Sequence, residues 1–216
     1  MKLKAVIFDV DGTLLDSRAF IFEAYEYALK KYGHNVPKRD VLAEQVTCSL
    51  QDAYTLIAED GDLDLLTAAH LEYQEKNLHH ITGYSGLHDM LADLQTAGLS
   101  LGLCSSRYKN LIPSLELCEI LESFDVVISG GDVAKHKPHP EGVLSAIRAL
   151  DVSPKQTAMI GDSWVDIAAG KAAQVAFTIG ITHGFSSRER LEQEGADYIV
   201  EYLREIPPLL LEGTAP

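Results

Sequence analysis

Short, uninterrupted apolar runs recur along this chain and alternate with segments of helical period. Runs rich in β-branched and aromatic residues are typical of strands that are buried on both faces of a parallel sheet. The predicted strands cover residues 4–8, 99–104, 124–129, 157–161, 175–179 and 198–200. Apolar residues at helical spacing predict helices over 84–97 and 140–150. Strand alternating with helix indicates an α/β fold, a doubly wound, Rossmann-like parallel sheet that binds ligands beyond the carboxyl ends of its strands.

One interval breaks this alternation, because from Ser17 to about His80 the chain carries helical signals only. Helices are predicted over residues 17–31, from Pro37, and over 50–59 and 63–78, with Ser49 and Asp62 as N-caps of the last two. Asp16 with Ser17 is predicted to cap the first of them. We therefore expect two domains, an α/β core of residues 1–16 and 82–216 and a small all-helical cap of residues 17–81.

Charge and composition exclude several classes of protein. Eighteen Lys and Arg against 32 Asp and Glu give a net charge of −14, the wrong sign for holding nucleic acid through its phosphates. An anionic ligand would need a local cation or a metal to reverse that field. No stretch approaches the ~18 apolar residues of a membrane span. An odd set of cysteines without a CxxC pair (Cys48, Cys104 and Cys118) favours reduced thiols and a cytoplasmic protein.

Two pairs of carboxylates follow predicted strands. Asp9 and Asp11 stand two residues apart after the first strand, where extended backbone would point both the same way. At ~4 Å and an effective dielectric of ~20 their repulsion is about 4 kcal/mol, so a cation between them or a proton on one is expected. Asp162 and Asp166 follow a later strand. Solvated turns or a favourable helix N-terminus are the alternatives, but together the four carboxylates suit Mg²⁺.

Groups that could hold an anion follow two other strands. Ser105, Ser106 and Arg107 come directly after the second strand of the predicted sheet and offer hydroxyls and backbone N–H groups. Lys137 precedes a helix that is predicted to begin at Pro140, and two prolines stiffen its approach. A solvated surface lysine is the alternative interpretation. His136 and His139 flank Lys137 and are the histidines placed to touch a substrate, whereas packing or surface roles are expected for the others.

These motifs, taken in order, resemble the haloacid dehalogenase superfamily of phosphohydrolases. They are DxDGT at residues 9–13, a serine after an apolar strand, a lysine in KPxP, and GDSxxD at residues 161–166. The inserted helices resemble the helical cap of that superfamily, and the nearest subgroup is similar to phosphoglycolate phosphatase. The resemblance runs from Lys4 to about Val200.

The resemblance implies a set of roles for these residues. Asp9 would be the nucleophile that becomes an aspartyl-phosphate, and Asp11 the acid and then the base of the two steps. Ser105 and Lys137 would complete the catalytic set by holding the phosphoryl oxygens.

Metal and phosphate binding are implied in the same way. The implied metal residues are Asp9, Asp11 through its backbone carbonyl, Asp162 and Asp166, with Mg²⁺ as the cofactor. The implied phosphate-binding residues are Thr13, Ser105, Ser106, Arg107 and Lys137, although Thr13 is also placed to cap the turn.

The expected function is a Mg²⁺-dependent phosphatase that hydrolyses a small, phosphoglycolate-like phosphomonoester. An inorganic pyrophosphatase is the close alternative. A β-phosphoglucomutase-like phosphotransferase is another, although that group usually carries Val where this chain has Thr13. A receiver-like or binding module without activity is the distant alternative. The expected partner is a small phosphorylated metabolite, with no nucleic acid and no membrane, and the chain is expected to be a monomer or a homodimer.

Overall fold

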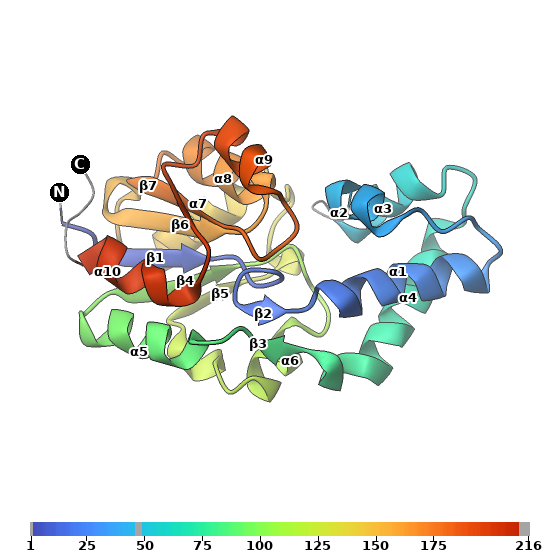
Figure 1. Ribbon diagram of the computed structural model, residues 1–216, viewed down its shortest axis with the longest axis horizontal. Coiled ribbons are helices and arrows are strands. Elements are labelled where there is room, and N and C mark those ends of the chain that lie inside the picture. The colour runs from blue at the N-terminus through green and yellow to red at the C-terminus, as the bar shows by residue number, and fades with distance from the viewer. Residues whose placement is uncertain (1, 46–48, 212–216) are drawn as a thin grey trace.

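A six-stranded parallel sheet forms the centre of the larger part of the molecule (Figure 1). The computed structural model describes residues 2–45 and 49–211. The strands lie in the order β5-β4-β1-β6-β7-β8, and each neighbouring pair is parallel. Their bounds are β1 Ala5–Phe8, β4 Ser100–Cys104, β5 Val126–Ile128, β6 Thr157–Gly161, β7 Phe177–Ile181 and β8 Tyr198–Val200. The predicted fold class is confirmed.

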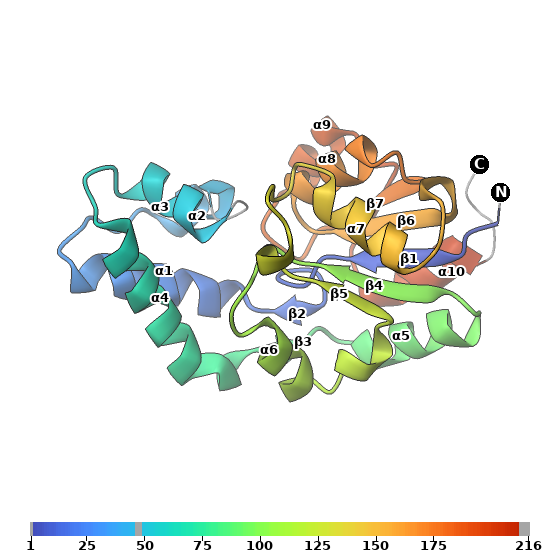
Figure 2. The ribbon, with the colours of Figure 1, turned by 180° about the vertical axis from the view of Figure 1, so that it is seen from behind.

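Helices cover both faces of this sheet, and the alternation of side chains along β1 shows why. Val6 and Phe8 pack into one apolar core, whereas Ile7, between them, packs into another on the opposite face. The first core includes residues of α5 (Leu87–Thr96), α6 (Leu111–Leu117) and α10 (Ile206–Leu211). The second includes residues of α7 (Glu141–Ala149) and α8 (Trp164–Ala172), and α9 (Arg188–Glu194) packs beside α8. Figure 2 shows α7 on the side of the sheet opposite α10.

The last but one strand begins two residues later than predicted. Val175 was expected to open it, but its backbone N–H donates to the carbonyl of Gly170 at 3.2 Å and so belongs to the end of α8. Val175 is buried there, which explains an apolar residue at that position without a strand. The strand itself begins at Phe177.

The helices of the insertion are α1 (Arg18–Lys31), α2 (Arg39–Gln45), α3 (Leu50–Ile57) and α4 (Leu63–Asn77). They surround an apolar core of their own, in which α1 packs against α4. Ser49 Oγ accepts from the backbone N–H of Asp52 at 3.2 Å. Asp62 Oδ1 accepts from the N–H groups of Asp64 and Leu65 at 3.1 Å. Both predicted N-caps are therefore confirmed.

The predicted cap of the first inserted helix is wrong. Ser17 precedes α1, but its side chain makes no capping hydrogen bond, and its ψ of 2° lies outside the extended region that capping requires. Its hydroxyl donates instead to Asp11 Oδ1 at 2.6 Å. The start of α2 was also misplaced, because the helix begins at Arg39 rather than at Pro37.

The insertion joins the sheet through two short strands that pair with each other. β2 (Leu15–Asp16) is antiparallel to β3 (Thr82–Gly83), with Leu15 opposite Gly83. Two-residue strands have no periodicity to detect, so sequence reasoning missed them. Figure 1 shows the insertion at one end of the molecule, and β1 and α10, the first strand and the last helix, toward the other.

The structure also bears on the cysteines and on the expected absence of a membrane span. Cys104 is buried and Cys118 half-buried, both as free thiols, and Cys48 lies outside the described residues. Within the described ranges, no helix has the length and apolar character to cross a membrane.

Candidate active site

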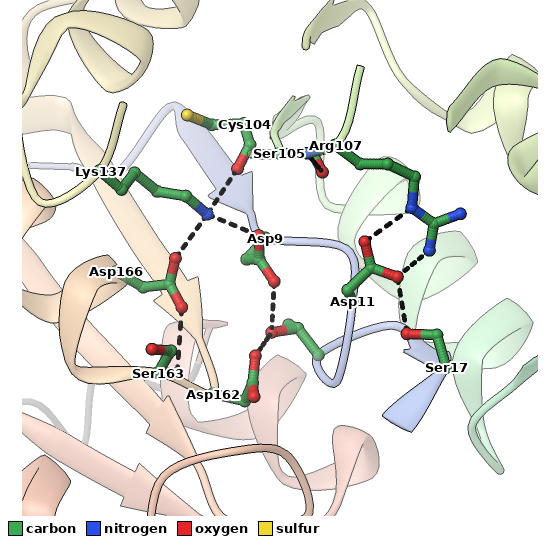
Figure 3. Close-up of polar contacts among 11 residues, drawn as sticks. Asp9, Asp11, Ser17, Cys104, Ser105, Arg107, Lys137, Asp162, Ser163 and Asp166 are labelled. Carbon is green, nitrogen blue, oxygen red and sulfur yellow. Dashed lines mark hydrogen bonds and ion pairs between the residues drawn. The ribbon is translucent and has the colours of Figure 1, made fainter. Parts of the chain in front are cut away.

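The sheet brings several of the predicted residues to one edge. Asp9 follows β1, Ser105 follows β4 and Asp162 follows β6, so all three leave the carboxyl ends of neighbouring strands. Lys137 reaches the same edge from the loop between β5 and α7. Figure 3 shows how these side chains meet.

Lys137 lies between two carboxylates. Its Nζ is 2.5 Å from Asp9 Oδ1 and 2.6 Å from Asp166 Oδ1, and it also donates to the carbonyl of Cys104 at 2.9 Å (Figure 3). The side chain is only 4% exposed, which rules out the solvated surface lysine. Burial on its own would lower the pKa of Lys137, but the charges of Asp166 and Asp9 outweigh it and raise the pKa. The ammonium is therefore a fixed positive charge in the site.

Three buried carboxylates cluster at this edge of the sheet, and two of them are paired with this lysine. Oxygens of Asp9, Asp162 and Asp166 lie within 4.8 Å of one another. Burial, together with the charges of its neighbours, raises the pKa of Asp162 well above its usual value, and burial raises that of Asp166 to about 6 despite Lys137. One ammonium against three carboxylates leaves an excess of buried negative charge. An oxygen-only ligand set of this charge fits a hard divalent cation such as Mg²⁺.

The turn after β1 holds Asp162 in place. Thr13 Oγ1 donates to Asp162 Oδ1 at 2.8 Å, and the backbone N–H of Phe185 donates to its Oδ2 at 2.6 Å. Gly12 has a φ of 82°, and a Cβ there would lie 2.6 Å from Asp162 Oδ2, so the turn needs glycine. Thr13 is fully buried and is not among the residues that line the pocket described below. Its hydroxyl therefore holds the Asp162 carboxylate from outside the pocket, whereas the sequence interpretation placed it at a phosphate.

Asp11 points away from the other carboxylates, toward Arg107 and Ser17 (Figure 3). Its Oδ2 accepts from Arg107 Nε at 2.9 Å, and its Oδ1 accepts from Arg107 Nη2 and from the hydroxyl of Ser17. Arg107 also donates to the hydroxyl of Ser114. Arg107 was expected among the phosphate-binding residues, and the structure pairs it with the expected acid and base instead. The sequence carries no signal for this pair, whose members stand 96 residues apart.

A pocket of about 350 Å³ lies between the insertion and the sheet. Of the predicted residues, Asp9, Asp11, Ser105, Ser106, Arg107, Lys137, Asp162 and Asp166 line it. His136 lines it as well. His139 is not part of the lining: its side chain is exposed, and its Nδ1 lies 3.9 Å from Glu141 Oε2. His70 of α4 also lines the pocket, although the sequence interpretation gave it no contact with the site.

Acid should destabilise the fold through His70. Burial lowers the pKa of His70 to about 3, so an unfolded chain with a histidine pKa of ~6.5 binds the proton first as pH falls. The contribution of neutral His70 is therefore complete above pH ~6.5 and is lost on acidification, by about 2 kcal/mol between pH 7 and pH 5. Urea unfolding at both pH values should show a smaller pH dependence in His70→Gln. Equal pH dependence in the two proteins would contradict a buried neutral histidine.

Fold and site together define a protein with a doubly wound α/β core, whose polar groups gather at the carboxyl ends of parallel strands beneath an inserted helical unit. The chain belongs to the haloacid dehalogenase-like hydrolases, whose family model matches residues 6–179. It is 30% identical over 207 residues to the pyrophosphatase PpaX of Oceanobacillus iheyensis, covering 95% of this chain and 96% of the relative.

Two solved structures resemble this chain over nearly its whole length. A predicted phosphatase from Clostridium acetobutylicum has a TM-score of 0.86 at 25% identity and covers 98% of this chain and 100% of its own. A predicted phosphoglycolate phosphatase from Haemophilus somnus also has a TM-score of 0.86, at 21% identity over 95% of this chain and 97% of its own, and shows the fold alone. The chain is a phosphatase of this family.

Proposed function

We propose that this phosphatase requires Mg²⁺ and hydrolyses a phosphomonoester of a small metabolite through an aspartyl-phosphate on Asp9. The observation that carries the proposal is the cluster of three buried carboxylates, two of them paired with Lys137, at the base of a pocket. Residues 17–81 would act as a cap over a core of residues 1–16 and 82–216, because the pocket is lined from both sides.

Asp9 is the group best placed to attack phosphorus. In the first step its carboxylate forms an O–P bond in line with the ester oxygen that leaves, and Asp11 gives that oxygen a proton. In the second step Asp11 takes a proton from water, whose oxygen attacks phosphorus and breaks the O–P bond to Asp9. The products are the free alcohol and inorganic phosphate.

Lys137 and Ser105 would stabilise the charge on the transferred group. Lys137 already lies against Asp9, so its ammonium is next to the place where phosphorus must approach. Ser105 Oγ accepts from the backbone N–H of Arg107 at 3.0 Å, which leaves the hydroxyl proton for a phosphoryl oxygen.

The metal would be held by Asp9, Asp162, Asp166 and the backbone carbonyl of Asp11. Bound Mg²⁺ supplies Lewis-acid neutralisation of the phosphoryl and carboxylate charges. The excess negative charge of the cluster supports this assignment.

Asp11 has to exchange partners before it can act. Arg107 and Ser17 engage both of its oxygens in this structure, so the carboxyl must leave them to reach the ester oxygen. Arg107 would then be free to meet the substrate, which is the phosphate-binding role that the sequence predicts for it.

Phosphoglycolate and pyrophosphate are the first compounds to test as substrates. Phosphoglycolate comes from the resemblance of the motifs, and pyrophosphate from the name of the 30% identical relative. A β-phosphoglucomutase-like reaction is tested beside them by analysing a sugar 1-phosphate incubation for the isomeric sugar phosphate, because that reaction would form the isomer without releasing phosphate.

Removing the metal should abolish the activity. Phosphate release is measured on phosphoglycolate, pyrophosphate, sugar phosphates, nucleotides and an aryl phosphate, with Mg²⁺ or with EDTA. We expect release in Mg²⁺, a loss of roughly 10²-fold or more in EDTA, and recovery when Mg²⁺ is restored. Undiminished release in EDTA would refute the metal requirement, and release of no phosphate from any compound would refute the proposed hydrolysis.

A further inference from the structure

The part of the pocket that the insertion contributes has no charged side chain among the described residues. We call this surface the roof. Its lining residues are Ile21, Tyr25, Ser49, Leu50, Gln51, Thr67, His70, Leu71 and Gln74. His70 is neutral because its burial lowers its pKa to about 3. The roof therefore offers amides, hydroxyls and apolar carbon to whatever lies beneath it.

Helix α4 turns one face toward the pocket. Thr67, His70, Leu71 and Gln74 recur at spacings of three and four residues, which places them on the same side of a helix. The opposite side of α4 carries residues such as Lys76, which is exposed. The Thr67 hydroxyl is buried and has no protein partner among the described residues, and a buried polar group in that state calls for a ligand or water.

Gln74 is held in one orientation over the site. Its side-chain amide lies 3.0 Å from His70 Nε2, and His70 Nδ1 lies 3.0 Å from the hydroxyl of Tyr54. Gln74 is only 6% exposed. The histidine engages one end of the amide, and the other end has no protein partner in the described part of the chain. A primary amide fixed in this way presents a hydrogen-bonding group to the pocket.

The cations of the pocket belong to the sheet side. Lys137 is paired with Asp9 and Asp166, and Arg107 with Asp11. Lys109 also lines the pocket and has no ion pair in the described structure, but its side chain is exposed. Positive charge thus lies where a phosphoryl group would be held, and the roof above it is neutral.

We propose that Gln74 determines substrate specificity by hydrogen-bonding the leaving group, and that this leaving group is uncharged and carries hydroxyl groups, as in a polyol or sugar phosphate. The inference rests on the proposed phosphatase reaction. A carboxylate or a second phosphate held against the roof would lose its water without gaining a cation from the roof, which is costly. A hydroxyl both donates and accepts, and so matches an amide. The pocket volume of about 350 Å³ also falls within the ~300–1,000 Å³ of small-molecule sites.

The wild-type enzyme gives the first test. We expect kcat/KM for the best polyol or sugar phosphate to exceed that for phosphoglycolate and for pyrophosphate by about tenfold or more. If either anionic compound is the best substrate, the inference is overturned while the proposed hydrolysis stands. The proposed hydrolysis fails separately, if Mg²⁺ and Asp9 prove unnecessary for release from every compound.

Gln74→Leu gives the second test, since leucine keeps much of the volume and removes the hydrogen bond. We expect kcat/KM for the hydroxylated substrate to fall about 10- to 100-fold, mostly through KM, and to fall less for an aryl phosphate without hydroxyls. Glu75→Gln, at an exposed position of the same helix outside the pocket lining, is the matched control and should keep wild-type values. An equal loss on both substrates would mean a structural role and would overturn the inference.

Gln74→Lys keeps the inference testable if the leucine variant folds poorly. A cation in the roof should raise the ratio of kcat/KM for phosphoglycolate to that for the hydroxylated substrate by tenfold or so. A ratio equal to that of the wild-type enzyme would show that the leaving group does not meet residue 74, which would also overturn the inference.

Discussion

Asp9→Asn should abolish phosphate release, lowering kcat by roughly 10⁴-fold or more. The amide has nearly the shape of the carboxylate but is a poor nucleophile, so no phosphoryl intermediate forms on it. The fold should survive, because the change removes one of three crowded buried charges. Phosphate release in Mg²⁺ measures the first effect, and circular dichroism with urea unfolding measures the second.

Asp93→Asn is the control for this variant. Asp93 is exposed on α5, outside the lining of the pocket, and the same chemical change there should leave kcat within about twofold of wild type. If Asp9→Asn folds normally and still turns over at more than a hundredth of the wild-type rate, Asp9 is not the nucleophile.

Lys137→Met is the second change from which a large effect is expected. It removes the positive charge that lies against Asp9, and we expect kcat/KM to fall roughly 10³-fold. It also leaves Asp166 without its cation in a buried place, so the free energy of unfolding should drop by about 3–5 kcal/mol. Steady-state kinetics and urea unfolding test both parts.

The conservative variant separates charge from shape. Lys137→Arg keeps a cation on a larger group and should recover most of the lost stability but less of the activity, because the planar guanidinium cannot take the place of a compact ammonium at 2.5 Å from Asp9. A Lys137→Met enzyme with wild-type kcat/KM would show that the lysine only balances the buried carboxylates.

The parts of this molecule that repeat a simple period could be predicted from the sequence. The strands of the sheet and the two N-caps at Ser49 and Asp62 depend on local patterns, and the structure confirms them. The meeting of Asp9, Ser105 and Asp162 also follows from local patterns, since parallel strands end at one edge. Their chemical roles stay predictions.

The remaining features depend on contacts between distant segments, for which one sequence has no signal. The pairing of Asp11 with Arg107 needs the side-chain orientations after two separate strands. The roof needs the placement of α4 over the sheet, so His70 and Gln74 were interpreted as packing or passed over. The N-cap predicted at Ser17 is wrong for a related reason. A serine before a helix satisfies the local rule for capping, but here its hydroxyl donates to the side chain of Asp11 instead.

The antiparallel pairing of β2 and β3 also bears on how the chain folds. β1 pairs with β4 across 95 residues, from Ala5 to Ser100, while Leu15 and Gly83 already close 68 of those residues into a side loop. With the insertion formed first, the loop left to close is about 27 residues long, and its entropic cost falls by about 1 kcal/mol. Once β2 and β3 have paired, the inserted segment therefore adds little to the entropic cost of pairing β1 with β4.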